Sequence, residues 1–356
     1  MNRGPTGPPC LGTEFPLPTA GAGRLGIGGT PLVPLVLPVC GIGRRLWLKL
    51  EGANAYGSIK ARTAHALIEH LEHGGGLEPG GSIVESTSGN LGVALAGICR
   101  ARGYRCTLVV DRDTPRRSIT LMADADADVV LVEPTAAGNP VAERLRMVRR
   151  ILAADRRMRW TDQYASPANP NVHERWTGPE LARGIGRAIG AVGPDAVVAA
   201  ISTGGTLAGL SAYFRRAHPN TTIVGVDAVG SVATGGERGA RPAKIPGFGS
   251  GRHSSFLRPG DWDVCVRVDD EYAAPACRVV RAATGLTLGG SSGAALLGAV
   301  VAARGDPELR EIGVICPDLG AAYLNTIYAS RRPPPPESEP ALREGLADLA
   351  AARRRG

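Results

Sequence analysis

Ser82-Ile83-Val84-Glu85 is followed at once by Ser86-Thr87-Ser88-Gly89-Asn90-Leu91-Gly92, where a segment of helical length begins. The first four residues are typical of a short strand, and six of the next seven are polar or glycine. Hydroxyls and free backbone N–H groups at a helix N-terminus bind anions, because the donors and the helix dipole converge there. A single Ser or Thr would be enough to cap a helix. The stretch therefore favours a carboxylate or phosphate site at the end of a strand.

The same alternation of strand and helix continues along most of the chain. It predicts an α/β fold with twisted, mostly parallel sheets flanked by helices. Ligands of such folds bind at the carboxyl ends of the strands. The expected strands are 82–85, 107–110, 129–133, 196–201, 223–227, 264–268 and 312–316. The expected helices are 60–73, 91–102, 141–153, 173–189, 207–217, 272–283, 291–303 and 321–328.

Two further turns resemble the first one in composition. Ser202-Thr203-Gly204-Gly205-Thr206 follows the strand 196–201, and Gly289-Gly290-Ser291-Ser292-Gly293 begins another helix. Glycines let the backbone approach a phosphate, and the hydroxyls add donors. The turn over 202–206 is not a Walker A loop, because no Gly-Lys-Ser/Thr follows. Three such turns in one α/β chain indicate a ligand with an anionic end.

Lys60 is the strongest candidate for a catalytic group. It follows Gly57-Ser58-Ile59 and begins a helix, whose dipole lowers the cost of the neutral amine. A neutral amine is what imine chemistry requires. The chain has only two other lysines, Lys49 and Lys244. We expect Lys49 to be a strand residue with its amine in water, and Lys244 to be a surface residue as well.

Composition excludes several classes of protein. A length of 356 residues suggests about two domains, and 43% apolar with 21% charged residues is typical of a soluble globular protein. The net charge of +8 is carried by arginines that are interleaved with acidic residues, which indicates a generally solvated surface. Aromatic residues make up only 4%, which disfavours base stacking. We expect no nucleic-acid partner.

The cysteines and histidines do not point to a metal site or a disulfide framework. Seven cysteines without a Cys-x-x-Cys pair are expected to be reduced, with Cys99 and Cys316 buried in apolar runs. No apolar signal segment and no run of about 18 apolar residues is present, so we expect a cytoplasmic protein without a membrane span. One helical segment is predicted to present a solvated face with His65, Glu69, His70 and His73.

Together these segments resemble the fold-type II pyridoxal phosphate enzymes, the family of cysteine synthase and the tryptophan synthase β chain. Residues 54–62 (NAYGSIKAR) resemble the motif of the cofactor-binding lysine, and 86–92 resemble the substrate-carboxylate loop. Residues 203–206 resemble the phosphate cup, and Ser291 resembles the serine that faces the pyridine nitrogen. The similarity runs in the expected order from about residue 27 to residue 330. Gly29-Thr30-Pro31-Leu32, Asn169-Pro170, His173 and Thr177-Gly178-Pro179-Glu180 also fit.

The resemblance implies pyridoxal 5'-phosphate as the cofactor and Lys60 as the catalytic residue, which holds the cofactor and moves the α-proton of the substrate. A neutral hydroxyl at Ser291 would leave the ring nitrogen largely unprotonated, which suits β-elimination better than transamination. The implied cofactor-binding residues are Lys60, Asn90, Thr203, Gly204, Gly205, Thr206 and Ser291. The implied substrate-binding residues are Thr87, Ser88, Gly89, Gln163, Gly247, Ser250 and Arg252.

If the substrate is a serine activated by a phosphate group, Arg252 is the candidate residue for binding that phosphate. Arginine donates paired hydrogen bonds to phosphate, and Arg252 follows a glycine-rich turn. An ordinary surface arginine is the alternative interpretation of this residue.

Finer features resemble the branch of N-(2-amino-2-carboxyethyl)-L-glutamate synthases. These are 226–232, 245–252, Cys316-Pro317-Asp318, and Leu91 where cysteine synthases usually carry threonine. That branch joins O-phospho-L-serine to L-glutamate for 2,3-diaminopropionate synthesis, which supplies siderophores or peptide antibiotics. Residues that depart from the pattern bear on the second substrate: Ala61, Leu319, Ala321-Ala322, and 169–173, which is closer to the cysteine synthase form.

Other functions remain open from the sequence. The nearest is a cysteine synthase that uses sulfide with O-acetylserine or O-phosphoserine. A catalytically silent cofactor-binding protein is a second alternative, and a nucleic-acid binder is a distant third.

The resemblance also implies a domain organisation and a homodimer. We expect a flexible N-terminal extension over 1–26 and a smaller, mobile α/β domain over 48–166. Residues 27–47 with 167–330 are expected to form the larger cofactor domain. The tail, 331–356, is rich in Pro and Arg and includes a stretch that can form a helix.

Overall fold

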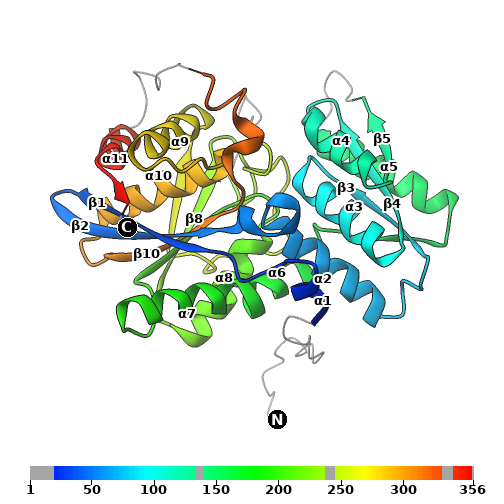
Figure 1. The fold of residues 1–356 in the computed structure, drawn as a ribbon, viewed down its shortest axis with the longest axis horizontal. Coiled ribbons are helices and arrows are strands. Elements are labelled where there is room, and N and C mark those ends of the chain that lie inside the picture. The colour runs from blue at the N-terminus through cyan, green and yellow to red at the C-terminus, as the bar shows by residue number, and fades with distance from the viewer. Residues whose placement is uncertain (1–19, 134–139, 237–244, 331–339, 355–356) are drawn as a thin grey trace, which may run out of the picture.

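A computed structural model describes residues 20–133, 140–236, 245–330 and 340–354. Two β-sheets flanked by helices make up this part of the chain (Figure 1). The fold class predicted from the sequence is confirmed. Most of the predicted extension, the proline run of the tail, Cys10 and Lys244 lie outside the described residues.

The larger sheet has seven strands in the order β11-β1-β2-β10-β7-β8-β9. β1 runs antiparallel to its neighbours β11 and β2, and the remaining neighbouring pairs of this sheet are parallel. The strands are β1 (Leu32–Val39), β2 (Ile42–Leu50), β7 (Ala196–Ala200), β8 (Thr222–Ala228), β9 (Val264–Val268), β10 (Glu311–Cys316) and β11 (Arg353–Arg354).

Helices cover both faces of this sheet (Figure 1). On one face, α9 (Asp270–Thr284), α10 (Gly290–Gly305) and α11 (Pro340–Ala350) bury a core that includes Leu48 and Val226. On the other face, α7 (Gly178–Ile189) and α8 (Gly205–Ala217) pack on Val197 and Ile223. Burial on both faces explains why these strands are nearly continuous runs of Val, Ile and Ala.

The smaller sheet is wholly parallel, in the order β5-β4-β3-β6. Its strands are β3 (Ser82–Ser86), β4 (Arg105–Asp111), β5 (Asp128–Val132) and β6 (Met158–Trp160). One face is covered by α2 (Lys60–His73), α3 (Asn90–Arg102) and α4 (Arg116–Asp124), and the other by α5 (Pro140–Ala154).

The other helices of the described residues are short. They are α1 (Ala20–Arg24), α6 (Ala168–Val172), a π-helical turn over His173–Thr177, and 3-10 turns over Glu51–Ala53, Ala55–Gly57 and Gly320–Tyr323. None of the helices in the described ranges is long and apolar enough to cross a bilayer.

All the predicted strands form, with bounds that differ by at most two residues. The sequence did not indicate β1 as a strand, because Pro34 and Pro38 interrupt its apolar run. Proline is tolerated there because β1 lies next to the edge of the sheet, and β11 pairs only with Leu35 and Val36.

Two helix predictions need correction. The predicted helix over 321–328 is wrong, because that segment has only a 3-10 turn over Gly320–Tyr323 and then irregular turns. The hydroxyl of Tyr328 bonds the backbone of Leu288, which holds the segment in its irregular path. The predicted helix over 173–189 is divided between the π-helical turn and α7.

Candidate active site

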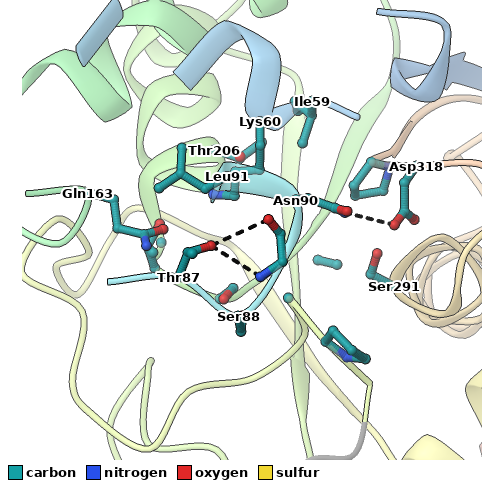
Figure 2. A pocket seen from close by; sticks show the side chains of 18 of the residues that line it. Ile59, Lys60, Thr87, Ser88, Asn90, Leu91, Gln163, Thr206, Ser291 and Asp318 are labelled. Atoms are coloured by element: carbon teal, nitrogen blue, oxygen red, sulfur yellow. Dashed lines mark hydrogen bonds between the residues drawn. The ribbon is translucent and has the colours of Figure 1, made fainter. Parts of the chain in front are cut away.

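A pocket lies where strands of both sheets end, the place at which α/β folds bind their ligands. It is lined by loops that are far apart in the sequence (Figure 2). Most residues implied by the family resemblance meet here. Those that line the pocket are Lys60, Thr87, Ser88, Gly89, Asn90, Gln163, Thr203, Gly204, Thr206, Gly247 and Ser291.

Three predicted residues do not line the pocket. Gly205 is the first residue of α8, directly after the lining residue Gly204. The backbone N–H of Ser250 donates to Ser231 Oγ at 3.0 Å. The guanidinium carbon of Arg252 lies 4.9 Å from the ring centroid of Tyr164, which itself lines the pocket.

Lys60 begins α2, as the sequence predicted, and its amine faces the pocket (Figure 2). The preceding backbone is fixed from another element, because the N–H of Ile59 donates to the carbonyl oxygen of Pro317 at 2.8 Å. Burial lowers the pKa of Lys60 to about 8, and the carboxylate of Glu85 acts in the opposite direction. Desolvation is thus the main cause of the lowered pKa.

Capture of pyridoxal phosphate by the apoprotein should accelerate as pH rises through about 8 and then level off. Only the neutral amine attacks an aldehyde, and a pKa of about 8 leaves roughly a tenth of Lys60 neutral at pH 7. Stopped-flow absorbance with apoprotein would measure this rate, and an N-acetyl-lysine derivative is the control amine. A rate that rises only near pH 10, as for the control, would contradict the lowered pKa.

The loop after β3 is shaped by the hydroxyl of Thr87. Its Oγ1 accepts hydrogen bonds from the backbone N–H groups of Gly89 and Gly92 at 3.1 and 3.0 Å. Gly89 has a φ of 148°, which favours glycine at this position. The N-terminus of α3 is thereby held open toward the pocket, where a carboxylate can bind.

Gln163 is tied to the same strand from another part of the chain. Its Nε2 donates to the carbonyl oxygen of Ser86 at 2.7 Å, and its backbone N–H donates to Glu85 Oε2 at 3.0 Å. Burial raises the pKa of Glu85 to about 7, although its hydrogen bonds favour the carboxylate. A buried arginine that sequence reasoning missed, Arg144, donates to Ser86 Oγ at 3.2 Å and pairs with Asp111.

The phosphate-cup segment approaches its neighbours too closely for any side chain at its glycines. Gly204 has a φ of 91°, and a Cβ there would lie 2.2 Å from Ser254 Oγ. A Cβ on Gly205 would lie 2.3 Å from the side-chain oxygen of Asn169. The first N–H groups of α8 are therefore bare of side chains, as phosphate binding requires.

His173 lies beneath this cup and is fully buried. Its Nε2 is 3.3 Å from Thr206 Oγ1, and its Nδ1 is 3.0 Å from Thr177 Oγ1. Burial, with Lys60 and Arg62 nearby, lowers the pKa of His173 well below its usual value. A neutral imidazole therefore supports the Thr206 hydroxyl.

The prediction that the Lys49 amine lies in water is wrong. The side chain is 3% exposed, and Nζ donates to the carbonyl oxygen of Thr30 and to Glu180 Oε2, both at 2.8 Å. Arg62 and Glu51 complete this buried network, with Arg62 Nε 2.7 Å from Glu51 Oε2. The partners come from distant parts of the chain, which the sequence pattern of one strand does not reveal.

His65 corrects the prediction of a solvated face on α2. It is 2% exposed, and its Nδ1 lies 2.9 Å from Nη2 of Arg102 on α3. Its ring packs edge-on against Trp176, with 6.2 Å between the centroids. Cys99 and Cys316 are buried, as the sequence predicted.

Glu51→Gln should lower the free energy of unfolding by about 3–5 kcal/mol, because it leaves a buried arginine with one carboxylate fewer. Glu51 and Arg62 both have fully buried side chains. Urea denaturation of the variant would measure the loss. Glu133→Gln is the matched control, since the Arg112–Glu133 pair is exposed and should contribute at most about 1 kcal/mol. Equal losses in the two variants would contradict the role of this network.

Comparison with known proteins identifies the family. Residues 23–318 match the model of the family described as pyridoxal-phosphate dependent enzymes. N-(2-amino-2-carboxyethyl)-L-glutamate synthase from Ralstonia nicotianae is 38% identical over 304 residues, covering 85% of this chain and 88% of that protein. Cysteine synthase from Staphylococcus aureus strain Mu50 is 34% identical, covering 84% of this chain and 94% of that protein.

A solved structure shares the fold. A hydrogen sulfide-producing enzyme from Fusobacterium nucleatum matches with a TM-score of 0.81 at 22% identity, covering 94% of this chain and 96% of that one. The chain therefore belongs to the pyridoxal-phosphate dependent enzymes, and pyridoxal phosphate is its cofactor. It is a fold-type II enzyme of the cysteine synthase family, with a reaction of the β-replacement type.

The residues of the pocket fit this cofactor. Lys60 offers an amine of lowered pKa for the aldehyde. The start of α8 offers bare N–H groups for the phosphate, because Gly204 and Gly205 leave no room for side chains. Ser291, at the start of α10 and 5% exposed, offers a neutral hydroxyl for a ring nitrogen.

Proposed function

We propose that the enzyme replaces the phosphate of O-phospho-L-serine with the amine of L-glutamate, giving N-(2-amino-2-carboxyethyl)-L-glutamate for 2,3-diaminopropionate synthesis. In this reaction the Cβ–O bond breaks, phosphate leaves with the electron pair, a Cβ–N bond forms, and the attacking amine loses a proton. A pathway to a siderophore or a peptide antibiotic would use the product.

One observation carries the choice of substrates. Several residues of the segments that resemble the glutamate-using branch line the pocket. Leu91, Pro246, Gly247 and Asp318 belong to those branch segments, and all of them line it. The similarity to the Ralstonia enzyme supports the same choice.

Each group of side chains has a proposed task. Pyridoxal phosphate, when bound, supplies an electron sink for the charge that develops at the α-carbon. Lys60 removes the α-proton and later returns it. The α-carboxylate is held by Thr87, Ser88 and Gln163. Thr203 to Thr206 hold the phosphate of the cofactor, Asn90 donates to its ring oxygen, and Ser291 faces its ring nitrogen.

Recognition of the leaving phosphate is assigned to Arg252. Its guanidinium stacks on Tyr164, a residue of the pocket wall. Arg252→Ala should raise the KM for O-phosphoserine about tenfold or more while changing that for O-acetylserine little, because only phosphate accepts paired hydrogen bonds. Steady-state kinetics with both donors would measure this, and Arg187→Ala, an exposed arginine on α7, is the control. Equal changes for the two donors would remove Arg252 from this role.

Product mass spectrometry tests the proposed substrates directly. The loaded enzyme would receive O-phospho-L-serine with L-glutamate and sulfide together. A glutamate adduct is the expected product. Cysteine alone would identify a cysteine synthase, in line with the similarity to the Staphylococcus aureus enzyme. Untouched phosphoserine would favour another activated serine or a catalytically silent protein.

The proposed function involves closure of the smaller domain over the substrate and a dimeric assembly. The pocket is lined by loops from both sheets, so closure of the smaller domain, 48–166, over the substrate would exclude water. The family resemblance favours a homodimer, and the composition favours a cytoplasmic location without nucleic-acid or membrane partners.

A further inference from the structure

Asp318 contacts the three loops that carry Lys60, Asn90 and Ser291, the residues proposed to bind the cofactor. The sequence analysis did not assign a task to Asp318. It follows β10 and lines the pocket beside Asn90 (Figure 2). Its backbone carbonyl accepts from the N–H of Gly289 at 3.2 Å, two residues before Ser291. It also forms an isolated β-bridge with Ser58, two residues before Lys60.

The side chain of Asp318 reaches the third loop. Its Oδ2 accepts a hydrogen bond from Asn90 Nδ2 at 2.9 Å (Figure 2). The same oxygen accepts another from the hydroxyl of Tyr323 at 2.7 Å. The residue is 5% exposed. No Lys or Arg of the described residues forms an ion pair with it.

The second carboxylate oxygen is buried without a hydrogen-bond partner. Oδ1 of Asp318 has none among the described residues. Oδ1 fits at this position only because residue 289 is a glycine, since a Cβ on Gly289 would lie 1.8 Å from Asp318 Oδ1. Burying a carboxyl group with half of its hydrogen-bonding capacity unused costs stability, so a role beyond packing is indicated.

The hydrogen-bonding groups of Asn90 and Asp318 indicate what this role is. An asparagine amide has a C=O side and an NH₂ side of nearly equal size, and it can turn over about its last torsion at little steric cost. A carboxylate only accepts hydrogen bonds. Asp318 therefore selects the orientation of Asn90 in which Nδ2 faces the carboxylate, and the second N–H of that nitrogen stays available to an oxygen in the pocket.

We propose that Asp318 is a positioning residue that locks the amide of Asn90 in the orientation that donates to the cofactor's ring oxygen. Tyr323 in turn orients the carboxylate through its hydroxyl. The inference rests on the role proposed for Asn90 and is independent of which nucleophile the enzyme uses.

A double-mutant cycle on cofactor affinity tests this proposal without any substrate. The Kd of pyridoxal phosphate would be measured by absorbance titration of apoprotein for the wild type, Asp318→Asn, Asn90→Ala and the double variant. Asp318→Asn should weaken binding about tenfold or more, because the introduced amide also donates hydrogen bonds and no longer selects one orientation of Asn90. The double variant should bind no more weakly than Asn90→Ala alone, since Asp318 acts through Asn90.

The spectrum supplies a readout that a packing role would not change. The pH dependence of the visible absorption of the loaded enzyme should shift in Asp318→Asn and Asn90→Ala alike, because both lose the same donor. Additive losses of affinity, or an unshifted spectrum in Asp318→Asn, would overturn the proposal. If Asp318→Asn does not fold, Tyr323→Phe replaces it, with an expected smaller weakening that also vanishes in the Asn90→Ala background.

Because the cycle contains no substrate, its failure leaves the proposed reaction standing. The product test, conversely, can fail while the cycle succeeds.

Discussion

Lys60→Ala should abolish turnover, with a loss of at least about 10⁴-fold in phosphate release from O-phosphoserine. Lys60 has two tasks in the proposed reaction, since it holds the cofactor covalently and transfers the α-proton. Lys49, the other lysine among the described residues, cannot replace it, because its amine is bound within the buried network at Glu180. Phosphate release and product mass spectrometry would measure the residual activity.

Covalent attachment distinguishes this role from a general effect on the fold. Borohydride reduction followed by peptide mass spectrometry should find the cofactor on the peptide that contains Lys60 in the wild type, and on no peptide in the variant. Lys244→Ala is the control, because its sequence context predicts a surface lysine and retained activity. Substantial turnover in Lys60→Ala with the cofactor bound normally would contradict the assignment of the catalytic residue.

Gly204→Ala should weaken pyridoxal phosphate binding by about 100-fold or more. The added Cβ would lie 2.2 Å from Ser254 Oγ and 2.9 Å from Leu257, and the backbone φ of 91° disfavours any side chain. The left-handed backbone alone costs about 1–2 kcal/mol, and relief of the contact would displace the start of α8 from the phosphate. Titration of apoprotein with the cofactor would measure the change.

Gly190→Ala is the matched control, because it also places a side chain on left-handed backbone but creates no close contact. Gly190 ends α7 with a φ of 67°, and an added Cβ there would meet no atom within 4 Å. Gly190→Ala should therefore lower the melting temperature slightly and leave the cofactor Kd unchanged. Equal affinities of the two variants would show that the cup tolerates a side chain and does not hold the phosphate closely.

Local patterns were sufficient for much of the fold. Val264–Val268 was predicted with the bounds that the structure has, and so was the helix over Lys60–His73. The hydrophobic periodicity and the boundary residues that define these segments lie within the segments themselves. Packing against neighbouring elements therefore changes their bounds little. Leu32–Val39 was missed, because its two prolines are acceptable only beside the edge of a sheet, and the order of strands is not a local property.

The candidate site was likewise predictable wherever it consists of a strand end and a helix start. Ser86 to Gly92, Thr203 to Thr206 and Ser291 have such a context, and most of these residues line one pocket. Arg252 was singled out by its residue type and its place after a glycine-rich turn, and it lies against Tyr164 rather than on the pocket wall. Asp318 had no local signal of its task, because its partner Asn90 is 228 residues away.

The sequence by itself determined the fold class, and the resemblance of its motifs to known enzymes indicated the family and the cofactor. The fold class follows from short-range rules, since strand, glycine-rich turn and helix are encoded within about ten residues of one another. The tertiary structure alone decided which buried polar groups meet. Lys49 reaches Glu180, His65 meets Arg102, and Asp318 faces Asn90. Burial turns such distant pairs into strong interactions, because a polar group removed from water must find its partner within the protein.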